Sequence, residues 1–432
     1  MDQGAGVAHV LALGAPLAVR SVDVKDGFSD IALPASSSGA PYRGLLVLVR
    51  VGGTPVGWLG VEAPATALLT ASALEGACRE QLMTGSLDEA RARAASGSGA
   101  PGQLQDDAMI SHVVTTCNQA SVAVRCVRAI VAAEGGPFEV VVVENRPARS
   151  TVHDALRAAF SGDERIRYVA EPVAGLSRAR NTGLAAAQGR VVAFTDDDIT
   201  VDPGWCGSLR EAFARDPGAS CVTGPILPAE LETDAQVLME RFATLGKGFV
   251  RRTYSLACPP ARDEQPLFPY TAGFLGSGGN AAFDREALLA LGGFDPALGI
   301  GTPAHGGEDL DIFIRLILAG RTLVYEPGAI AWHPHPSAMG ALSREVFSYG
   351  VGLGAMLTKQ LVAGPQRLRL IEKIPRGFGY LANSGSRKNA AKGSGYPSYL
   401  DRLEQAGLAL GPAGYACSRW RDRRLAVGRR SP

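Results

Sequence analysis

The stretch Gly189-Arg190-Val191-Val192-Ala193-Phe194-Thr195-Asp196-Asp197-Asp198 decides the fold class of this chain. Its apolar middle predicts a buried strand, and three carboxylates follow at the carboxyl end of that strand. In an open α/β sheet this end faces the ligand crevice. Clustered carboxylates repel one another unless a cation joins them. The stretch therefore predicts a divalent-cation site at the sheet edge, and an acidic turn that caps the next helix is the alternative.

The chain around this stretch alternates between strand and helix patterns. Apolar runs at 110–116 and 138–143 predict strands, and the second run is continuous enough to be buried on both faces. A stripe of apolar residues between them predicts a helix, and the Ala-rich segment 176–188 predicts another one before Gly189. This alternation predicts an α/β fold, with a mostly parallel sheet flanked by helices.

Residues 1–86 differ from this pattern and predict a small β-rich module. Apolar segments at 45–51 and 56–61 are typical of strands, and Gly52-Gly53 between them predicts a hairpin turn. Residues 65–83 predict a helix that follows the hairpin. No catalytic cluster occurs in this module, so its role stays open.

The remaining boundaries follow from composition. Residues 87–107 are rich in Ala, Gly, Ser and charge, which is typical of a linker. We expect the main α/β domain over 108–340 and a helical, basic extension over 341–432. That extension holds 16 lysines and arginines against 5 acidic residues, although the whole chain has a net charge of only +1.

Charge and cysteine content limit the partners and the compartment. A net charge near zero gives no reason to expect a nucleic-acid partner. The seven cysteines lack paired spacing, which favours free thiols in a reducing cytosol. We find no signal peptide and no run of about 18 apolar residues. We therefore expect a cytoplasmic protein, either free or peripheral at the inner face of the membrane.

Seven polar clusters follow one another through the α/β region. In chain order they are Thr115-Thr116-Cys117-Asn118, Val143-Glu144-Asn145, Leu176-Ser177-Arg178-Ala179-Arg180-Asn181, Asp196-Asp197-Asp198, Gly278-Gly279-Asn280, Gly307-Glu308-Asp309 and Trp332-His333-Pro334-His335. This order and spacing resemble the family 2 glycosyltransferases of the GT-A fold, over about residues 109–337. The resemblance implies an inverting, metal-dependent enzyme that moves a sugar from a nucleotide-diphosphate sugar, with UDP favoured, to a hydroxyl of an unknown acceptor.

The resemblance also implies which residues bind the donor. They are Thr115, Thr116, Asn118, Glu144, Arg178, Arg180, Asn181, Asp196, Asp197, Gly279 and Asn280. Glu144 stands where the family usually has Asp, so the nucleobase that it would contact stays open. Only one of Arg178 and Arg180 needs to face the site, because either guanidinium could bind phosphate.

The same resemblance implies a metal and a general base. Asp198 and Asp196 match the family's Asp-x-Asp motif and would bind Mn²⁺ or Mg²⁺, with His333 as the third ligand and His335 as the alternative. Asp309 would deprotonate the acceptor hydroxyl, and Glu308 would support it.

Two other classes of protein stay open at this point. Asp196-x-Asp198 after an apolar strand is also typical of haloacid-dehalogenase-like phosphatases, and a glycosyltransferase domain could be a degenerate nucleotide-sugar-binding scaffold. The acceptor is unknown, with lipid-linked glycans, envelope glycans and natural products all conceivable. The basic extension suggests peripheral contact with an anionic membrane.

Overall fold

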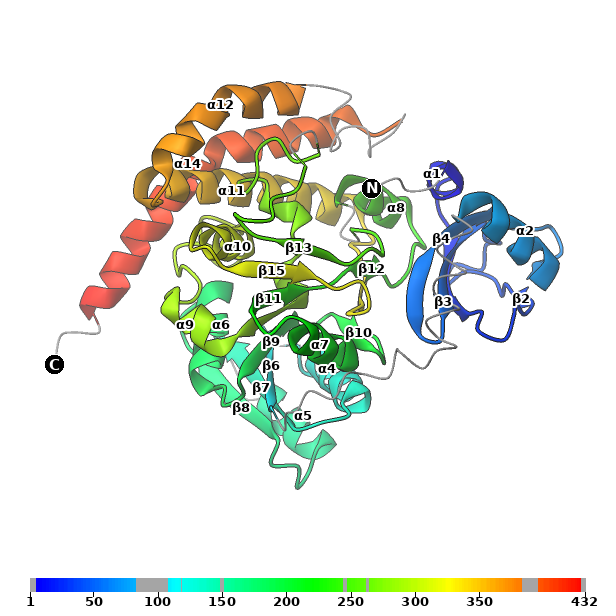
Figure 1. The fold of residues 1–432 in the computed structure, drawn as a ribbon, viewed down its shortest axis with the longest axis horizontal. Coiled ribbons are helices and arrows are strands. Elements are labelled where there is room, and N and C mark those ends of the chain that lie inside the picture. Colours follow the sequence, from blue (N-terminus) through cyan, green and yellow to red (C-terminus); the bar gives the residue numbers. More distant parts are fainter. Residues whose placement is uncertain are drawn as a thin grey trace.

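The protein is described here from a computed structural model, which covers residues 5–82, 108–117, 119–147, 151–243, 247–261, 264–382 and 395–428. An eight-stranded sheet with helices on both faces forms the centre of the molecule (Figure 1). The N-terminal module lies at one side of this centre, and the C-terminal helices lie along another. The predicted fold class is confirmed.

The central sheet has the strand order β13-β15-β11-β14-β9-β6-β7-β8. Its strands are β6 Ile110–Thr116, β7 Phe138–Asn145, β8 Ile166–Glu171, β9 Val191–Asp196, β11 Ala219–Thr223, β13 Arg252–Tyr254, β14 Ala281–Asp284 and β15 Thr322–Tyr325. Strands β9, β6, β7 and β8 are parallel, whereas β14 runs antiparallel to its neighbours β9 and β11. The carboxyl ends of the four parallel strands therefore meet at one edge, next to the start of β14.

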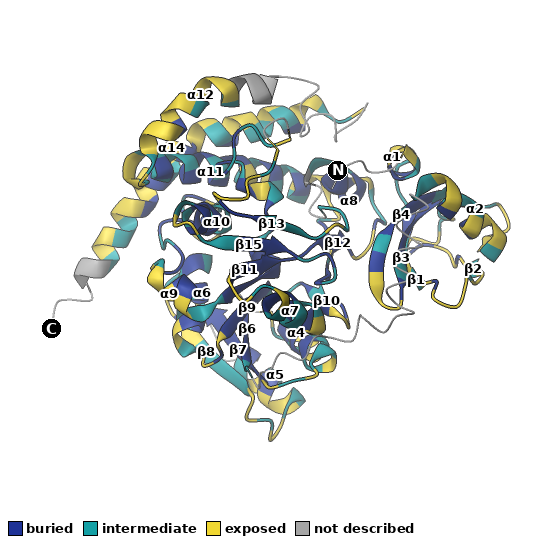
Figure 2. Ribbon diagram, viewed as in Figure 1, coloured by how far each residue is buried: buried dark blue, intermediate teal, exposed yellow. Residues whose placement is uncertain are grey.

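Each face of the sheet is covered by helices. The helices of this region are α4 Ala120–Ala133, α5 Thr151–Ala159, α6 Leu176–Ala186, α7 Trp205–Arg215, α8 Asp234–Ala243, α9 Arg285–Ala290 and α10 Glu308–Leu318, with 3₁₀ turns η1 Ala272–Phe274 and η2 Gly278–Asn280. Alternate residues of β7 belong to different cores, since Val141 packs with α6 and α10 while Val140 packs with α4 and α7. Both sheet faces are consequently buried, as Figure 2 shows for β6, β7 and β9. This explains why the β7 sequence is continuously apolar.

A second, small sheet lies beside the first. It has the order β10-β16-β12, and its strands are β10 Thr200–Val201, β12 Ile226–Pro228 and β16 Ala331–His333. A turn after β15 separates this strand from β16. The turn lets the two strands join different sheets, and β16 ends at His333.

The N-terminal module contains the predicted hairpin. Its elements are α1 Ala5–Ala12, β1 Leu17–Asp23, β2 Ile31–Ala32, β3 Gly44–Val51, β4 Thr54–Glu62, β5 Leu68–Leu69 and α2 Ala71–Gln81. Gly52 and Gly53 both adopt positive φ, as the turn between β3 and β4 requires. The helix expected from residue 65 begins later, because β5 pairs with β2 and the Thr70 hydroxyl accepts a hydrogen bond from Ala73 N. The predicted linker 87–107 lies outside the described residues.

The module is fastened to the small sheet by an ion pair and by aromatic rings. Arg50 of β3 donates to Asp202 just after β10, with Nη2 and Oδ2 2.6 Å apart and both side chains almost buried. Asp202 also accepts a hydrogen bond from Trp332 Nε1, at 3.1 Å. The ring of Trp58 meets that of Trp332 edge to face at 6.5 Å. The module therefore supports β16 directly beside His333.

The basic extension folds into long helices. They are α11 Met339–Ala363, α12 Arg367–Ala382 and α14 Ser398–Gly428. Within the described part of the chain, no helix has the length and apolarity needed to cross a membrane.

Glycines bring the backbone of α11 close to its neighbours. A Cβ at Gly350 would collide with the backbone of α14, and one at Gly354 would lie 3.0 Å from Cα of Gly411. On another side of α11, a Cβ at Gly352 would lie 2.9 Å from the carbonyl carbon of Gly306, just before α10. We call Gly350, Gly352 and Gly354 the glycine seam. Close packing at the glycine seam explains how α11 is stable in the protein although its glycines give it poor intrinsic helix propensity.

Candidate active site

Two threonines at the end of β6 hold two of the three aspartates. Thr115 pairs in register with Asp196 of β9, and its hydroxyl donates to Asp196 Oδ1 at 3.2 Å. The hydroxyl of Thr116 donates to Asp197 Oδ2 at 2.5 Å. Burial and the charges of Asp198 and Asp196 raise the pKa of Asp197 to about 6. The expected repulsion within the triplet is therefore present.

Arg180 connects the aspartates to helix α10. Its guanidinium is buried and donates to Asp196 Oδ1 at 3.1 Å and to Glu308 Oε1 at 2.9 Å. Although burial opposes it, the charges of Asp196, Glu308 and Asp309 raise the pKa of Arg180. Arg180 thus remains a cation and joins the first half of the domain to the second.

Asp309 is the carboxylate at the start of α10 that stays partly open. Its Oδ2 accepts a hydrogen bond from Gly278 N at 3.0 Å, and its Oδ1 accepts one from Leu310 N at 2.7 Å. The preceding Glu308 is buried, and burial and the charge of Asp309 raise its pKa against the effect of Arg180. Glu308 therefore orients Arg180, and Asp309 is the group of the pair that an acceptor could reach.

Asp198 and His333 face each other across the other end of the site. Asp198 Oδ2 lies 3.4 Å from His333 Nε2, and the Asp198 side chain is 48% exposed. Although burial acts against both shifts, the pair lowers the pKa of Asp198 and raises that of His333. His335 instead contacts Glu240 of α8 at 3.1 Å, so His333 is the one of the two histidines that meets the acidic triplet.

A divalent metal fits the Asp198–His333 pair. A carboxylate oxygen and an imidazole nitrogen are ligand types that Mn²⁺ and Mg²⁺ accept, and diphosphate oxygens and water would complete the coordination. The other expected carboxylate ligand, Asp196, is not part of this pair. Its Oδ1 is occupied by Thr115 and Arg180, which turn that oxygen toward the interior.

Glu144 has an acceptor atom to spare at the end of β7. The carboxylate is fully buried, and Tyr168 donates its hydroxyl proton to Oε2 at 2.7 Å. Among the residues that the structure describes, Oε1 has no hydrogen-bond partner. A buried oxygen without a partner is costly, so a ligand N–H at this position would satisfy it.

Two residues predicted to bind the donor, Arg178 and Asn181, make their contacts inside the protein instead. Arg178 pairs with Asp422 of α14. The amide of Asn181 donates to Phe294 O at 2.8 Å and accepts from Phe294 N at 2.9 Å, which fastens a loop. These contacts leave Arg180 as the arginine that faces the aspartates.

The amide of Asn280 is also a structural group. It is fully buried, accepts a hydrogen bond from Trp205 Nε1 at 2.8 Å, and donates to the carbonyls of Pro225 and Ala329. Gly279 lies beside the aspartates, since a Cβ there would be 3.0 Å from Asp196 Oδ2. Asn118 lies outside the described residues.

Helix α11 contributes two side chains that the sequence did not indicate. Glu345 lies close enough to His333 for its charge to raise the pKa of that histidine. The Tyr349 hydroxyl donates to Glu345 Oε1 at 2.8 Å. No local signal marks these residues, because only the packing of α11 brings them to the site.

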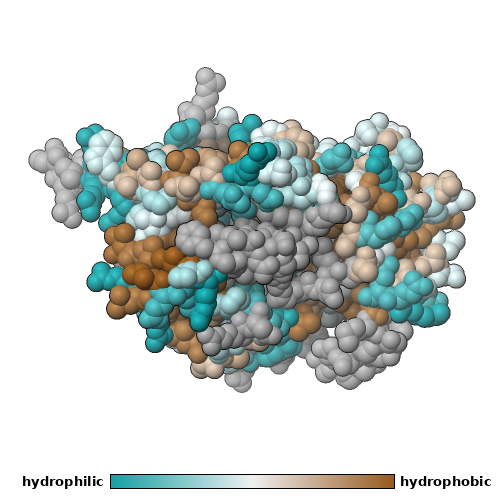
Figure 3. Space-filling view, turned by 90° about the horizontal axis from the view of Figure 1, so that it is seen from above, coloured by the Kyte–Doolittle hydropathy of each residue, from teal (hydrophilic) through white to brown (hydrophobic). Residues whose placement is uncertain are grey.

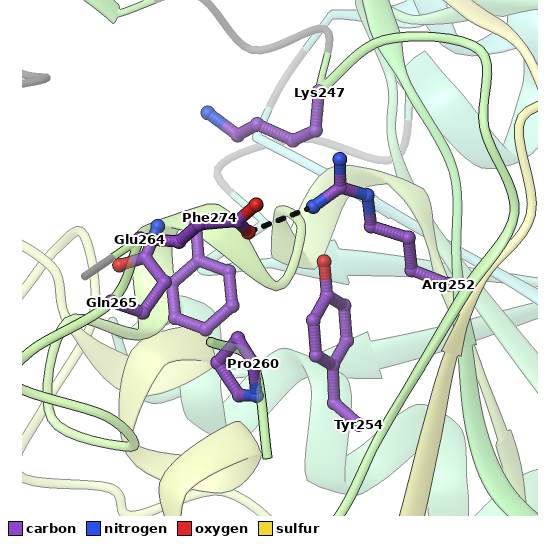
Figure 4. Close-up of a pocket in the computed structure, with 7 residues that line it drawn as sticks. All are labelled: Lys247, Arg252, Tyr254, Pro260, Glu264, Gln265 and Phe274. Atoms are coloured by element: carbon purple, nitrogen blue, oxygen red, sulfur yellow. Dashed lines mark hydrogen bonds and ion pairs between the residues drawn. The ribbon is translucent and has the colours of Figure 1, made fainter. Parts of the chain in front are cut away.

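A small pocket elsewhere contains none of the predicted site residues. Figure 4 shows its lining, in which Arg252 pairs with Glu264 at 3.4 Å beside Tyr254 and Phe274. We therefore place the functional site at the carboxyl ends of the strands and not in this pocket.

Comparison with known proteins relates part of the α/β domain to a family. Residues 111–292 match the family model described as glycosyl transferase family 2. Pre-mycofactocin glycosyltransferase of Mycobacterium tuberculosis is 29% identical over 253 residues, which cover 55% of this chain and 49% of that protein. Succinoglycan biosynthesis protein ExoM of Rhizobium meliloti is 29% identical over 238 residues, covering 52% of this chain and 67% of that protein.

The match to glycosyl transferase family 2 covers residues 111–292 of the chain, which hold the donor side of the candidate site. The chain spans about half the length of pre-mycofactocin glycosyltransferase. Among solved structures, a mannosyltransferase from Pyrobaculum calidifontis in complex with GDP-Man and Mn²⁺ aligns with a TM-score of 0.45 and 20% identity, over 78% of this chain and 86% of that one.

Proposed function

We propose that this protein transfers a sugar from a nucleotide-diphosphate sugar to an acceptor hydroxyl, with inversion at the anomeric carbon and with Mn²⁺ or Mg²⁺ bound. The observation that carries the proposal is the pairing of Asp198 with His333 at one end of the site and the half-open Asp309 at the other. A phosphatase would need neither of the two downstream groups, and the family match favours the transferase.

Different residues would bind the donor and the acceptor. Glu144 would accept an N–H of the nucleobase, and uracil supplies one, so UDP is the favoured carrier. Asp198 and His333 would hold the metal, which would neutralise the diphosphate leaving group. Asp309 would take the proton of the acceptor hydroxyl as its oxygen attacks the anomeric carbon from the side opposite the diphosphate. Arg180 would keep Asp196 and Glu308 paired throughout.

Titration with UDP, with and without Mn²⁺, tests the donor half. The substitution Asp198→Asn keeps the shape and removes the charge, so Mn²⁺-dependent UDP affinity should fall at least tenfold, or about 1.4 kcal/mol. Unchanged affinity in this variant would contradict the metal assignment. A panel of nucleotide-sugars scored for slow hydrolysis then identifies the sugar, since hydrolysis needs no acceptor.

Helix α12 supports a further part of the proposal, which is peripheral contact with an anionic membrane at the cytoplasmic face. Its exposed apolar side chains are Leu368 at 69%, Ile371 at 50% and Ile374 at 37%, and Val362 just before it is 67% exposed. Its basic residues are Arg367, Arg369, Lys373 and Arg376. In Figure 3, hydrophobic side chains gather toward the left, on the side where α11 ends and α12 begins. An apolar stripe with flanking cations is typical of helices that lie in the interface of a bilayer.

Sedimentation with vesicles tests this membrane contact. Full-length protein should pellet with vesicles that contain anionic lipid at low salt, and the bound fraction should fall at high salt. Leu368→Asp should reduce binding several-fold, whereas Leu289→Asp, at an exposed leucine on α9, should not. Protein that stays in the supernatant at low salt would exclude membrane contact.

A further inference from the structure

Helix α11 carries an acid and an aromatic ring beside the site, just before the point where it packs against the start of α10. Glu345 and Tyr349 lie one turn apart and are joined by the hydrogen bond from the Tyr349 hydroxyl. Tyr349 lies one turn before Gly352, which packs against Gly306 and Gly307 just ahead of Asp309. The Tyr349 ring therefore lies on the part of α11 next to the proposed base, and it remains 40% exposed.

Tyr349 begins a row of parallel rings. Its ring centroid lies 6.2 Å from that of Phe242 on α8, with 9° between the ring planes. The Phe242 centroid lies 6.3 Å from that of Tyr396, just before α14, at 14°. We call Tyr349, Phe242 and Tyr396 the aromatic row. Three separate segments supply it, so tertiary packing and not one local motif creates it.

The aromatic row is fixed from beneath. Phe242 and Tyr396 pack on a small apolar cluster whose fully buried members include Leu342, Val346 and Leu400. Phe242 and Tyr396 themselves are only half-buried. A surface that is held rigidly and remains partly open to solvent binds a ligand with little loss of side-chain freedom.

This chemistry suits a sugar ring. A pyranose has C–H groups on its faces and hydroxyls around its rim, so it packs on aromatic rings and donates hydrogen bonds to carboxylates. Glu345 supplies a carboxylate at the end of the row, and Asp309 lies in the first turn of α10, whose start packs against α11. A phosphate-terminated acceptor would meet these same negative charges and be repelled.

We infer that the aromatic row and Glu345 form the acceptor subsite, and that the acceptor ends in a neutral sugar ring whose hydroxyl is presented to Asp309. The inference rests on the proposed glycosyl transfer and names its acceptor class. The ring next to the base stacks on Tyr349, and Glu345 accepts a hydrogen bond from one of its hydroxyls. A second ring extends toward Phe242 and Tyr396.

Saturation-transfer NMR with small saccharides tests the inference. The probes are methyl hexopyranosides and disaccharides, with glycerol phosphate and a short alkyl phosphate as comparators. UDP and Mg²⁺ are present, because Mg²⁺ is diamagnetic. At least one saccharide should bind the wild-type protein, and neither phosphate should. Tyr349→Ala should weaken saccharide binding at least tenfold, and more than it weakens UDP binding, while Tyr349→Phe should lose less than threefold.

The matched control is Tyr399→Ala, since Tyr399 is 39% exposed on α14 but outside the aromatic row. This variant should bind the saccharide like the wild type. Phe242→Leu retains apolar volume, so its expected loss of saccharide binding would not come from unfolding, and a thermal melt checks this. Wild-type protein that binds UDP but no saccharide, or that prefers a phosphate, would overturn the acceptor class alone. Failure to bind UDP with any metal would overturn the transferase proposal and the inference with it.

Discussion

The N-terminal module and the C-terminal helices support opposite ends of the same site, and they do so in different ways. The module uses side chains, because Arg50 and Trp58 reach Asp202 and Trp332 beside His333. Helix α11 uses backbone, because Gly352 packs against Gly306 before the helix that carries Asp309. One region thus supports the proposed metal end of the site, and the other supports the end with the proposed base.

The difference predicts how each support fails. A side-chain contact is lost when its atoms are removed, and the neighbouring strand can remain in place. A backbone contact is lost when atoms are added, because two main chains at contact distance have no rotamers with which to yield. Variants in the module should therefore weaken metal-dependent donor binding, and variants in the glycine seam should slow turnover.

The largest effect is expected when the proposed base, Asp309, is replaced. This loss of turnover is the reference for variants in helix α11, which should slow turnover in the same way. Asp309→Asn should lower kcat by roughly 10²–10⁴, or about 3–5 kcal/mol in activation free energy, because no base remains to take the proton of the substrate hydroxyl. UDP affinity should stay within a few-fold. Steady-state kinetics and titration measure the two quantities, with Asp154→Asn on α5 as the control. A product of retained anomeric configuration, seen by NMR, would contradict the mechanism.

The next largest effect is expected at the ion pair of the module. Arg50→Gln leaves Asp202 almost buried without its cation, so the free energy of unfolding should fall by about 3 kcal/mol. The Mn²⁺ concentration needed for UDP binding should rise several-fold, since β16 loses support next to His333. Arg79→Gln breaks an exposed pair in the same module and should cost less than about 1 kcal/mol in denaturant unfolding. Equal effects of the two substitutions would show that the module is not a support.

The glycine seam should give a smaller loss, of about 1–3 kcal/mol in stability. Gly352→Ala adds one methyl group 2.9 Å from Gly306, and donor hydrolysis should fall about tenfold as α10 shifts. Gly340→Ala, near the start of the same helix and clear of other backbone, should be neutral or stabilising by less than about 1 kcal/mol. If Gly352→Ala also stabilised the protein, close packing at this position would be disproved.

The smallest effect is expected on the change of Tm at low pH. Lys359 of α11 donates to Asp295 at 3.0 Å, and although burial opposes it, the lysine charge lowers the pKa of Asp295. A carboxyl with a lowered pKa stabilises the folded state above its unfolded pKa and loses that contribution as pH falls through the folded value. The Tm of Asp295→Asn should consequently fall less between pH 5 and pH 3 than the wild-type Tm does. If the Tm of the wild type and that of the variant fell in parallel, Asp295 would contribute nothing to holding α11 on the α/β domain.

Much of the central fold could be predicted because its signals are local. The continuous apolar run of β7 and the acids at the end of β9 each depend on their own strand. The pairing of Asp198 with a histidine after a later strand also follows from the order of the motifs.

The roles of single polar side chains could not be predicted so well. Arg178, Asn181 and Asn280 have the residue types expected of a donor site, but each found a partner inside the protein. Tyr349 and Glu345 show the opposite case. Sequence reasoning missed them, because only helix packing brings them to the site. An amide or guanidinium can serve a ligand or a loop, and its tertiary neighbours decide which.

The glycine seam also limits which substitutions this protein can accumulate. At Gly352 every other amino acid brings a Cβ into the backbone of Gly306, so a large set of substituted proteins should show almost none that tolerate a change there. The module contact offers more freedom, because an aromatic or a cation can be exchanged for a similar group. Residues that support the proposed metal end can therefore be substituted one at a time. Residues that support the end with the proposed base can be substituted only when α10 and α11 change together.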